Sequence, residues 1–147
     1  MGVDCAFCAN NERIEADLPA RERVFVAENW RVVANKSALA GWLLVICRRH
    51  VESLADLTPE EEASLGRVLA DGTRALEDVV GSVKTYAMLF AEGTKHLHFS
   101  LVPRMADIPR HLKGAAVSGY NAEGPALDES EQDRLGERLA AAWPDRG

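Results

Sequence analysis

The chain has 147 residues, of which 47% are hydrophobic and 27% charged, and its formal net charge is −6. These proportions are typical of a globular protein with a sizeable core, and they exclude a disordered chain. No apolar run approaches the ~18–20 residues of a membrane-spanning helix, and the N-terminal residues carry no basic-then-apolar leader. We therefore expect one domain over residues 1–147, located in the cytoplasm and not associated with a membrane.

The acidic balance argues against a protein that binds nucleic-acid polymers, because such proteins normally present a basic surface. It still allows a small anionic ligand, since the field in a pocket depends on local charge. Six basic residues are candidates for a local cluster of this kind: Arg48, Arg49, Lys95, Arg104, Arg110 and Lys113. Each of them is also compatible with an ordinary solvated charge.

Two segments early in the chain predict a β-hairpin. Residues 23–27 and 30–34 are rich in β-branched and aromatic residues, and the Glu28-Asn29 step between them is typical of a tight turn. Residues 42–47 form a continuous apolar run. Such a run is expected of a central strand that is buried on both faces.

A long helix is predicted to follow this strand. Thr58 can cap its N-terminus, Pro59 suits the first helical position, and Glu61 completes a capping box. The helix should run to about Val79 and end before Gly81. Residues that can face a core recur along it at helical spacing: Leu65, Leu69, Gly72 and Leu76.

The later part of the chain predicts two more strands, over residues 83–91 and 96–102, joined by a turn at 92–95. A last helix should start near Asp128, where Glu131 provides a second capping box. Its buried stripe would consist of Leu135, Leu139, Ala142 and Trp143. Because strands outnumber helices and a short turn joins the last strand pair, we expect a mainly antiparallel α+β fold.

The last predicted strand carries a row of polar side chains. Side chains alternate along a strand, so His96, His98 and Ser100 should share one face. The alternate positions form a core face: Leu97, Phe99 and Leu101. A neutral imidazole is well populated near pH 7 and can attack phosphorus, which makes a histidine in this row a candidate nucleophile. The other interpretation is that two histidines decorate a half-solvated strand.

Three cysteines are too few, and odd in number, for a disulfide scaffold. Cys5 and Cys8 have the spacing of half a structural zinc site, although two free thiols would give the same pattern. Cys47 ends the apolar strand and is expected to pack as a small apolar residue.

The stretch 93–104, Gly-Thr-Lys-His-Leu-His-Phe-Ser-Leu-Val-Pro-Arg, resembles the signature of the histidine triad (HIT) superfamily, His-φ-His-φ-His-φ-φ followed by Pro-Arg. The bacterial HIT pattern is matched in order by four further pieces: Cys5-Ala6-Phe7-Cys8, Leu18-Pro19-Ala20, residues 41–54 and residues 57–60. The resemblance covers about residues 5–105, which leaves a C-terminal extension of about 106–147. It implies the HIT-like fold, with one long helix after the central strand and a C-terminal helix.

The resemblance also implies a chemistry. The middle position of the triad is His98, which would attack the α-phosphate of a nucleotide or dinucleoside polyphosphate and form a covalent nucleotidyl-histidine. Hydrolases and nucleotidyltransferases of the superfamily share this step. Substrate contacts are implied for Ser100, Arg104 and Asn35. Asn35 is equally explained as a turn residue, Arg104 as a structural ion pair, and a homodimer is expected because many relatives dimerise.

Members with a leading Cys-x-x-Cys bind zinc with a Cys₂His₂ set. The resemblance carries this set to Cys5, Cys8, His50 and His96, and it implies a structural zinc ion. His96 would then anchor the start of the histidine strand, while His98 keeps the chemistry. The alternative for His50 is a core histidine that hydrogen-bonds the backbone.

Ser100 stands where the third triad histidine belongs, Trp42 replaces a histidine, and Cys47 replaces a proline. A serine hydroxyl can donate to a phosphoryl oxygen but cannot carry positive charge. The alternative function is therefore a nucleotide-binding domain with weak or no catalysis. A third hypothesis is a structural zinc protein that binds a partner. Glu92, which precedes the turn, could reach the site.

Overall fold

The computed structural model describes residues 5–145, within which one antiparallel sheet has five strands in the order β1-β2-β3-β5-β4. The strands are β1 (Phe25–Val26), β2 (Trp30–Ala34), β3 (Leu43–Cys47), β4 (Lys84–Met88) and β5 (His98–Arg104). The α-helices are α1 (Ala6–Asn11), α2 (Pro59–Val80) and α3 (Glu129–Ala142). Short 3₁₀ segments span Glu15–Asp17, Ala20–Glu22, Leu54–Asp56, Arg110–Leu112 and Gly114–Ala122.

The predicted hairpin and central strand are confirmed. β1 pairs with β2, and the turn between them closes through a hydrogen bond from the backbone N–H of Ala27 to the carbonyl of Trp30. β3 pairs with β2 on one side and with β5 on the other, and its side chains are buried except that of Leu44, which is half-buried. The α+β class with a mainly antiparallel sheet is therefore correct.

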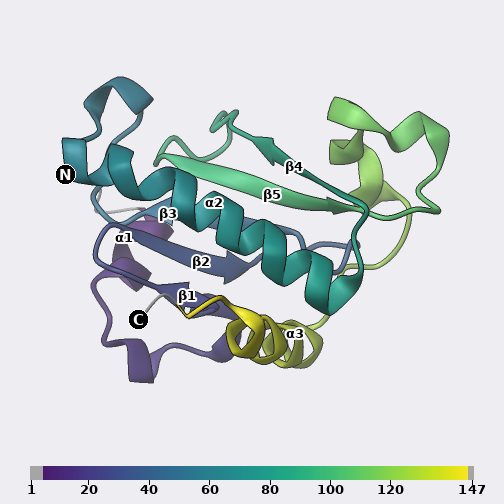
Figure 1. Cartoon of the computed structure of the whole chain (residues 1–147), viewed down its shortest axis with the longest axis horizontal. Coiled ribbons are helices and arrows are strands. Elements are labelled where there is room, and N and C mark those ends of the chain that lie inside the picture. Colours follow the sequence, from purple (N-terminus) through teal and green to yellow (C-terminus); the bar gives the residue numbers. More distant parts are fainter. Residues whose placement is uncertain (1–4, 146–147) are drawn as a thin grey trace.

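Helix α2 follows the sequence signals closely. The Thr58 hydroxyl accepts a hydrogen bond from the Glu61 N–H, and the Glu61 carboxylate accepts one from the Thr58 N–H, which is a complete capping box. Gly81 ends the helix with a left-handed backbone (φ 71°), a conformation that glycine adopts without steric cost. The helix lies across one face of the sheet, with α3 beside it along the β1–β2 side (Figure 1).

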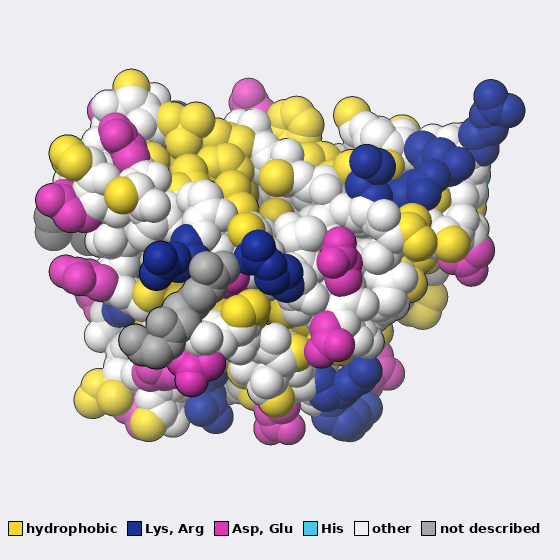
Figure 2. Space-filling model, viewed as in Figure 1, with side chains coloured by type: hydrophobic (Ala, Val, Ile, Leu, Met, Phe, Trp, Pro, Cys, Tyr) yellow, Lys and Arg dark blue, Asp and Glu magenta, His cyan; other side chains and the backbone are white. Residues whose placement is uncertain are grey.

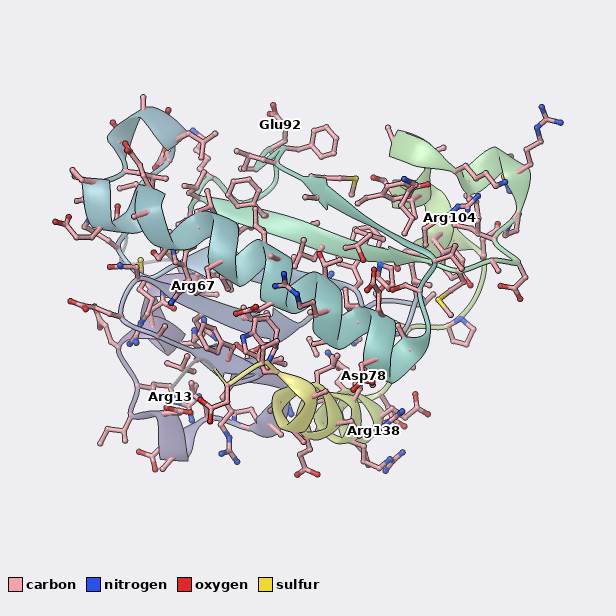
Figure 3. All side chains as sticks on the ribbon, in the orientation of Figure 1. Arg13, Arg67, Asp78, Glu92, Arg104 and Arg138 are labelled. Carbon is pink, nitrogen blue, oxygen red and sulfur yellow. The ribbon has the colours of Figure 1, made fainter. Side chains whose placement is uncertain are left out.

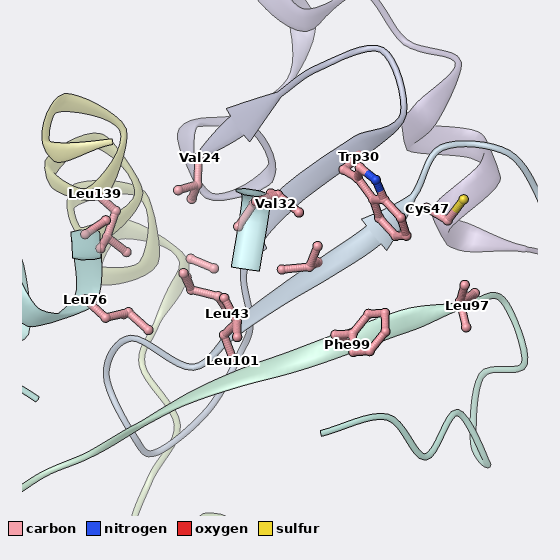
Figure 4. Close-up of a cluster of buried hydrophobic side chains, with 14 of the residues drawn as sticks. Val24, Trp30, Val32, Leu43, Cys47, Leu76, Leu97, Phe99, Leu101 and Leu139 are labelled. Carbon is pink, nitrogen blue, oxygen red and sulfur yellow. The ribbon is translucent and has the colours of Figure 1, made fainter. Parts of the chain in front are cut away.

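The main core lies between this face of the sheet and the two long helices (Figure 4). Its buried side chains alternate along the strands, and include Trp30, Val32, Leu43, Phe99 and Leu101. At Gly72 a Cβ atom would lie 2.6 Å from Leu101 Cδ1, so any larger residue there would force the Leu101 side chain to shift. A second cluster on the opposite face packs against the segment after β5: Leu39, Trp42, Val102, Ile108, Leu112 and Val117.

The last two strands differ from their predicted boundaries. β4 ends at Met88 because the chain turns away beyond it, and Ala91 has a left-handed backbone (φ 53°) that a strand does not accept. β5 begins at His98, two residues later than predicted, and extends to Arg104. Before it, the N–H of Leu97 donates to the carbonyl of Val51 instead of to a strand ladder. His96 therefore precedes the strand and does not share the row of His98 and Ser100.

The face that carries α2 shows acidic and basic side chains interspersed, and no histidine of the described residues is visible on it (Figure 2). The side chains of His98 and Ser100 accordingly lie on the other face of the sheet. Within residues 5–145, no helix is both long and apolar enough to cross a membrane.

Glu61 joins the helix start to the chain after β3, and it generates a prediction about stability. Its buried carboxylate accepts hydrogen bonds from Arg49 Nε and Nη2, both 3.0 Å away, and these bonds, with the Thr58 N–H, lower the pKa of Glu61. Glu61→Gln should lower the free energy of unfolding at pH 7 by about 1–2 kcal/mol, because the charge-assisted bonds are lost.

A lowered carboxyl pKa contributes stability above the unfolded value of 4.5 and loses it as the pH falls through the folded value. The difference in the free energy of unfolding between Glu61→Gln and the natural protein should therefore become smaller in acid. Urea unfolding at pH 7 and below pH 4.5 measures it. Glu60→Gln, one residue earlier and exposed, is the matched control. An equal loss in both variants would contradict the account.

Candidate functional site

Four residues from separate parts of the chain meet beside the start of β5. Cys5 immediately precedes α1 and Cys8 lies within it, while His50 follows β3 and His96 precedes β5. Their ligating atoms all lie within 4.8 Å of one another. The structure thus brings together the four residues predicted to bind a metal.

Hydrogen bonds fix the tautomer of both histidines. His96 Nε2 lies 2.6 Å from the carbonyl oxygen of Cys47, and His50 Nε2 lies 3.3 Å from Glu52 Oε2. Both partners accept hydrogen bonds, so each Nε2 carries a proton and each Nδ1 presents a lone pair. The two Nδ1 atoms are 3.1 Å apart. Outer partners of this kind commonly orient histidines that bind a metal.

The spacing of these atoms suits a small tetrahedral ion. Zinc bonds of about 2.3 Å to sulfur and about 2.0–2.1 Å to nitrogen place tetrahedral ligand atoms roughly 3.3–3.8 Å apart. Here Cys5 Sγ lies 3.3 Å from His96 Nδ1, and Cys8 Sγ lies 3.2 Å from His50 Nδ1 and 3.5 Å from His96 Nδ1. The set is therefore compatible with zinc.

The electrostatics of the cluster also favour a cation. Burial raises the pKa of Cys8 to about 11, and a hydrogen bond and charge from Cys5 add to this effect. Burial lowers the pKa of His96 and so disfavours its protonated form. A thiol with a raised pKa keeps its proton near pH 7 until a divalent ion displaces it, so metal binding to this cluster would release protons.

His98 is the first residue of β5 and is oriented by the backbone beside it. Its Nδ1 lies 2.7 Å from the carbonyl oxygen of His96. Because a carbonyl only accepts, Nδ1 carries the proton and Nε2 has the free lone pair. Nε2 has no hydrogen-bond partner among the described residues. The ring is therefore held with a potential nucleophilic nitrogen available.

His98 and Ser100 line a cavity of about 480 Å³ on the face of the sheet opposite α2. Phe7 and Asn35 contribute one side, and residues 90–94 after β4 contribute another. Glu92 is among these loop residues, as the sequence suggested. Within residues 5–145, no lysine or arginine lines this cavity. Any positive field on a bound phosphate would thus come from outside the lining or from the ring of His98.

A second cavity of about 250 Å³ shares Phe7, Asn35 and Leu44 with the first, so the two form one extended cleft. Its remaining lining is more polar and consists of Arg21, Glu22, Val33, Ala34, Lys36, Glu129 and Gln132. Glu129 and Gln132 belong to α3, so the C-terminal extension contributes to the cleft. The Gln132 side-chain amide donates to the carbonyl of Ala34 at 3.1 Å, which fixes its orientation.

Arg104 is placed apart from the other predicted substrate contacts. It shares the face of His98 and Ser100 but lies six residues beyond His98, about 20 Å along the strand, and does not line the cavity. Figure 3 shows Arg104 at the C-terminal end of β5. Glu92 follows the C-terminal end of β4, which pairs with the opposite end of β5. Arg48 and Arg49 are also occupied elsewhere, by backbone carbonyls and by Glu61.

Sequence reasoning missed Phe7 and Gln132 as residues of the cleft. Phe7 had a usable signal, because a residue between the two cysteines of a predicted metal site is held close to their partners. Gln132 had none, since nothing local in α3 indicates that the helix packs against the end of β2.

No protein-family model matches the sequence, and a search of curated proteins finds no relative. Solved structures do match, and many of them are histidine triad proteins. A zinc-bound histidine triad family protein from Mycobacterium smegmatis is 23% identical, with a TM-score of 0.70 over 95% of this chain and 92% of that one.

Two further matches extend the comparison. A hypothetical histidine triad nucleotide-binding protein from Sulfolobus tokodaii is 18% identical, with a TM-score of 0.69 over 94% and 91% of the two chains. The diadenosine triphosphate hydrolase of Plasmodium falciparum is 11% identical, with a TM-score of 0.65 over 92% of each chain. The chain therefore has the histidine triad fold, and the fold implied by the sequence resemblance is confirmed.

The hydrogen bond of His98 makes a direct prediction. At neutral pH, long-range ¹H–¹⁵N spectra should show the signals of an imidazole protonated at Nδ1 and unprotonated at Nε2. The exposed His111 is the internal control, because its Nε2 lies 3.5 Å from Glu123 Oε1 and should therefore carry the proton of the neutral ring. Finding the proton of His98 on Nε2 would contradict the orientation described above.

Proposed function

We propose that this chain is a histidine triad enzyme, a nucleotide hydrolase or nucleotidyltransferase that attacks the α-phosphate of its substrate with His98. One observation carries the proposal: His98 Nδ1 is bound to the carbonyl of His96, which leaves Nε2 as the nucleophile in a cavity next to Ser100. The fold supports it, as do the printed names of two structural neighbours, a nucleotide-binding protein and a diadenosine triphosphate hydrolase.

The first step forms a bond between His98 Nε2 and the α-phosphorus. The bond from phosphorus to the leaving group breaks, and its electron pair departs with that group. Phosphorylation at Nε2 makes the imidazole cationic, and the His96 carbonyl at 2.7 Å stabilises that charge through the Nδ1–H. In the second step, water or another acceptor attacks the same phosphorus and releases Nε2.

The remaining cleft residues bind and orient the substrate. The Ser100 hydroxyl donates a hydrogen bond to a non-bridging phosphoryl oxygen. Asn35, at the junction of the two cavities, contacts the ribose, and the second cavity takes the base. Arg104, at the far end of β5, would contact only a substrate that extends well beyond the cleft.

Zinc would be held by Cys5, Cys8, His50 and His96. All four positions are taken by protein atoms, which is typical of a structural site, because a catalytic zinc keeps one position open. When bound, the ion would cross-link the chain segments that carry these four residues and would take no part in the reaction. The protein's own part is to fix His96, whose carbonyl orients the nucleophile.

Two observations favour a second candidate, a domain that binds a nucleotide without turnover. Ser100 cannot supply the positive charge of a third histidine, and no lysine or arginine lines the cavity of His98 within the described chain. Under this alternative the protein binds nucleotides but forms no covalent adduct, and Ser100→His does not restore one.

Intact-protein mass spectrometry tests the enzyme directly. After brief exposure to nucleoside polyphosphates and nucleoside phosphoramidates, the natural chain should gain the mass of one nucleotidyl group, a nucleoside monophosphate less one water, on His98. His98→Ala should lose the adduct and lower turnover by at least about a thousandfold, since the nucleophile itself is removed.

His111→Ala is the matched control, because His111 is exposed and does not line the cleft, and it should behave like the natural chain. Full turnover by His98→Ala would refute the mechanism. Tight nucleotide binding with no adduct in either the natural chain or Ser100→His would instead select the binding domain.

Metal analysis tests the zinc site. The purified chain should contain one zinc ion, and Cys5→Ser or His50→Asn should lose most of it and lower the melting temperature. Cys47→Ala removes a thiol that is buried beside the cluster but absent from it, and should retain the metal. Equal zinc content in all these variants would show that the ion is bound elsewhere.

A further inference from the structure

Phe7 connects the metal cluster to the cleft. It lies between Cys5 and Cys8, at the beginning of α1. Its ring packs edge-to-face against His96, with centroids 5.6 Å apart, and against His98, with centroids 5.1 Å apart. It also lines both cavities of the cleft. One side chain thus touches a metal ligand, the nucleophile and the space for the substrate.

The two ends of α1 are held in different ways. At its C-terminal end, the Asn11 side chain donates to the carbonyls of Cys47 and Arg48 and accepts from Arg31 Nε at 2.7 Å. At its N-terminal end, Cys5 provides no side-chain cap. What holds this end is the cluster, through Cys5 and Cys8.

A helix of six residues is not stable by itself in water, so the position of its first turn depends on those contacts. A bound metal replaces the weak hydrogen bonds among two thiols and two imidazoles with four strong bonds. The same bonds fix the turn that carries Phe7.

We propose that metal occupancy of the Cys5, Cys8, His50 and His96 cluster sets the nucleotide affinity of the cleft, with Phe7 as the positioning residue that couples the two sites. The inference rests on the proposed function, since it takes the cleft to be a nucleotide site. With metal bound, Phe7 forms the wall shared by both cavities and excludes water beside His98. Without metal, the first turn of α1 loosens and this wall is lost.

The coupling is reciprocal by thermodynamic linkage. If metal raises the affinity for a nucleotide by some factor, the nucleotide must raise the affinity for the metal by the same factor. This equality holds whatever carries the coupling, so Phe7 is identified as the positioning residue by a loss of coupling in Phe7→Leu while the metal stays bound.

The experiment uses the full chain, zinc-loaded and after chelation, with AMP and GMP as probes. Zinc removal should weaken nucleotide binding by about 5- to 50-fold in titration calorimetry, and saturating nucleotide should tighten zinc binding by the same factor in competition with a chelating dye. Phe7→Leu should keep one zinc per chain but reduce both effects to less than about twofold. Phe25→Leu, at a phenylalanine stacked on Trp143, is the matched control and should keep the full coupling.

Cobalt gives a readout that does not require the metal-free protein to remain folded. In the Co²⁺-loaded chain, nucleotide binding should shift the visible absorption bands of the ion, and this shift should be absent in Phe7→Leu and present in Phe25→Leu. Equal shifts in all three proteins, or equal nucleotide affinity with and without zinc in a folded chain, would overturn the coupling while leaving the nucleotide site in place. Failure of the zinc-loaded natural chain to bind either nucleotide would instead refute the proposed function and the coupling with it.

Discussion

His96 makes three contacts at once, and the geometry of the site depends on them. Its Nε2 donates to the carbonyl of Cys47 at the end of β3, which turns Nδ1 toward the cysteines and His50. Its own carbonyl accepts from His98 Nδ1 at 2.7 Å. A residue whose side chain is fixed on both nitrogens has little freedom in its backbone, so the ring of His98 inherits a fixed orientation. The cysteine–histidine cluster and the ring of His98 are thus two ends of one short chain of bonds.

The two faces of the sheet differ: one packs against the long helices, and the other carries the cleft. Side chains alternate along each strand, so the residues that pack beneath α2 leave the intervening positions to face the other way. On that opposite face, α1 covers one end of the sheet and the 3₁₀ segments after β5 cover the other. The cleft lies between them. Its floor is the sheet, whose other face packs against α2. Part of its wall comes from short or irregular segments, α1 and residues 90–94, where a small change in position alters the space for a ligand.

The electrostatics of the cleft differ between its two parts. The cavity beside His98 has Glu92 and no lysine or arginine in its described lining, whereas the adjoining cavity contains Arg21 and Lys36. Arg21 is itself paired with Asp133 at 3.0 Å, which offsets its charge. A phosphate at His98 would therefore be bound mainly by neutral hydrogen-bond donors. Such a site favours orientation of the reacting group over strong attraction of polyanions.

The sequence by itself determined the elements whose signals are local: the capping boxes at Thr58 and Asp128, the glycine that ends α2, the hairpin and the apolar central strand. Through the resemblance it also predicted the Cys5, Cys8, His50 and His96 set, which the structure brings together, and selected His98. Only the tertiary structure decided that β5 starts at His98, that Arg104 lies outside the cleft, and that Phe7 touches both His96 and His98. These features depend on contacts between residues as much as 91 positions apart, as for Cys5 and His96, and periodicity within a segment carries no information about them.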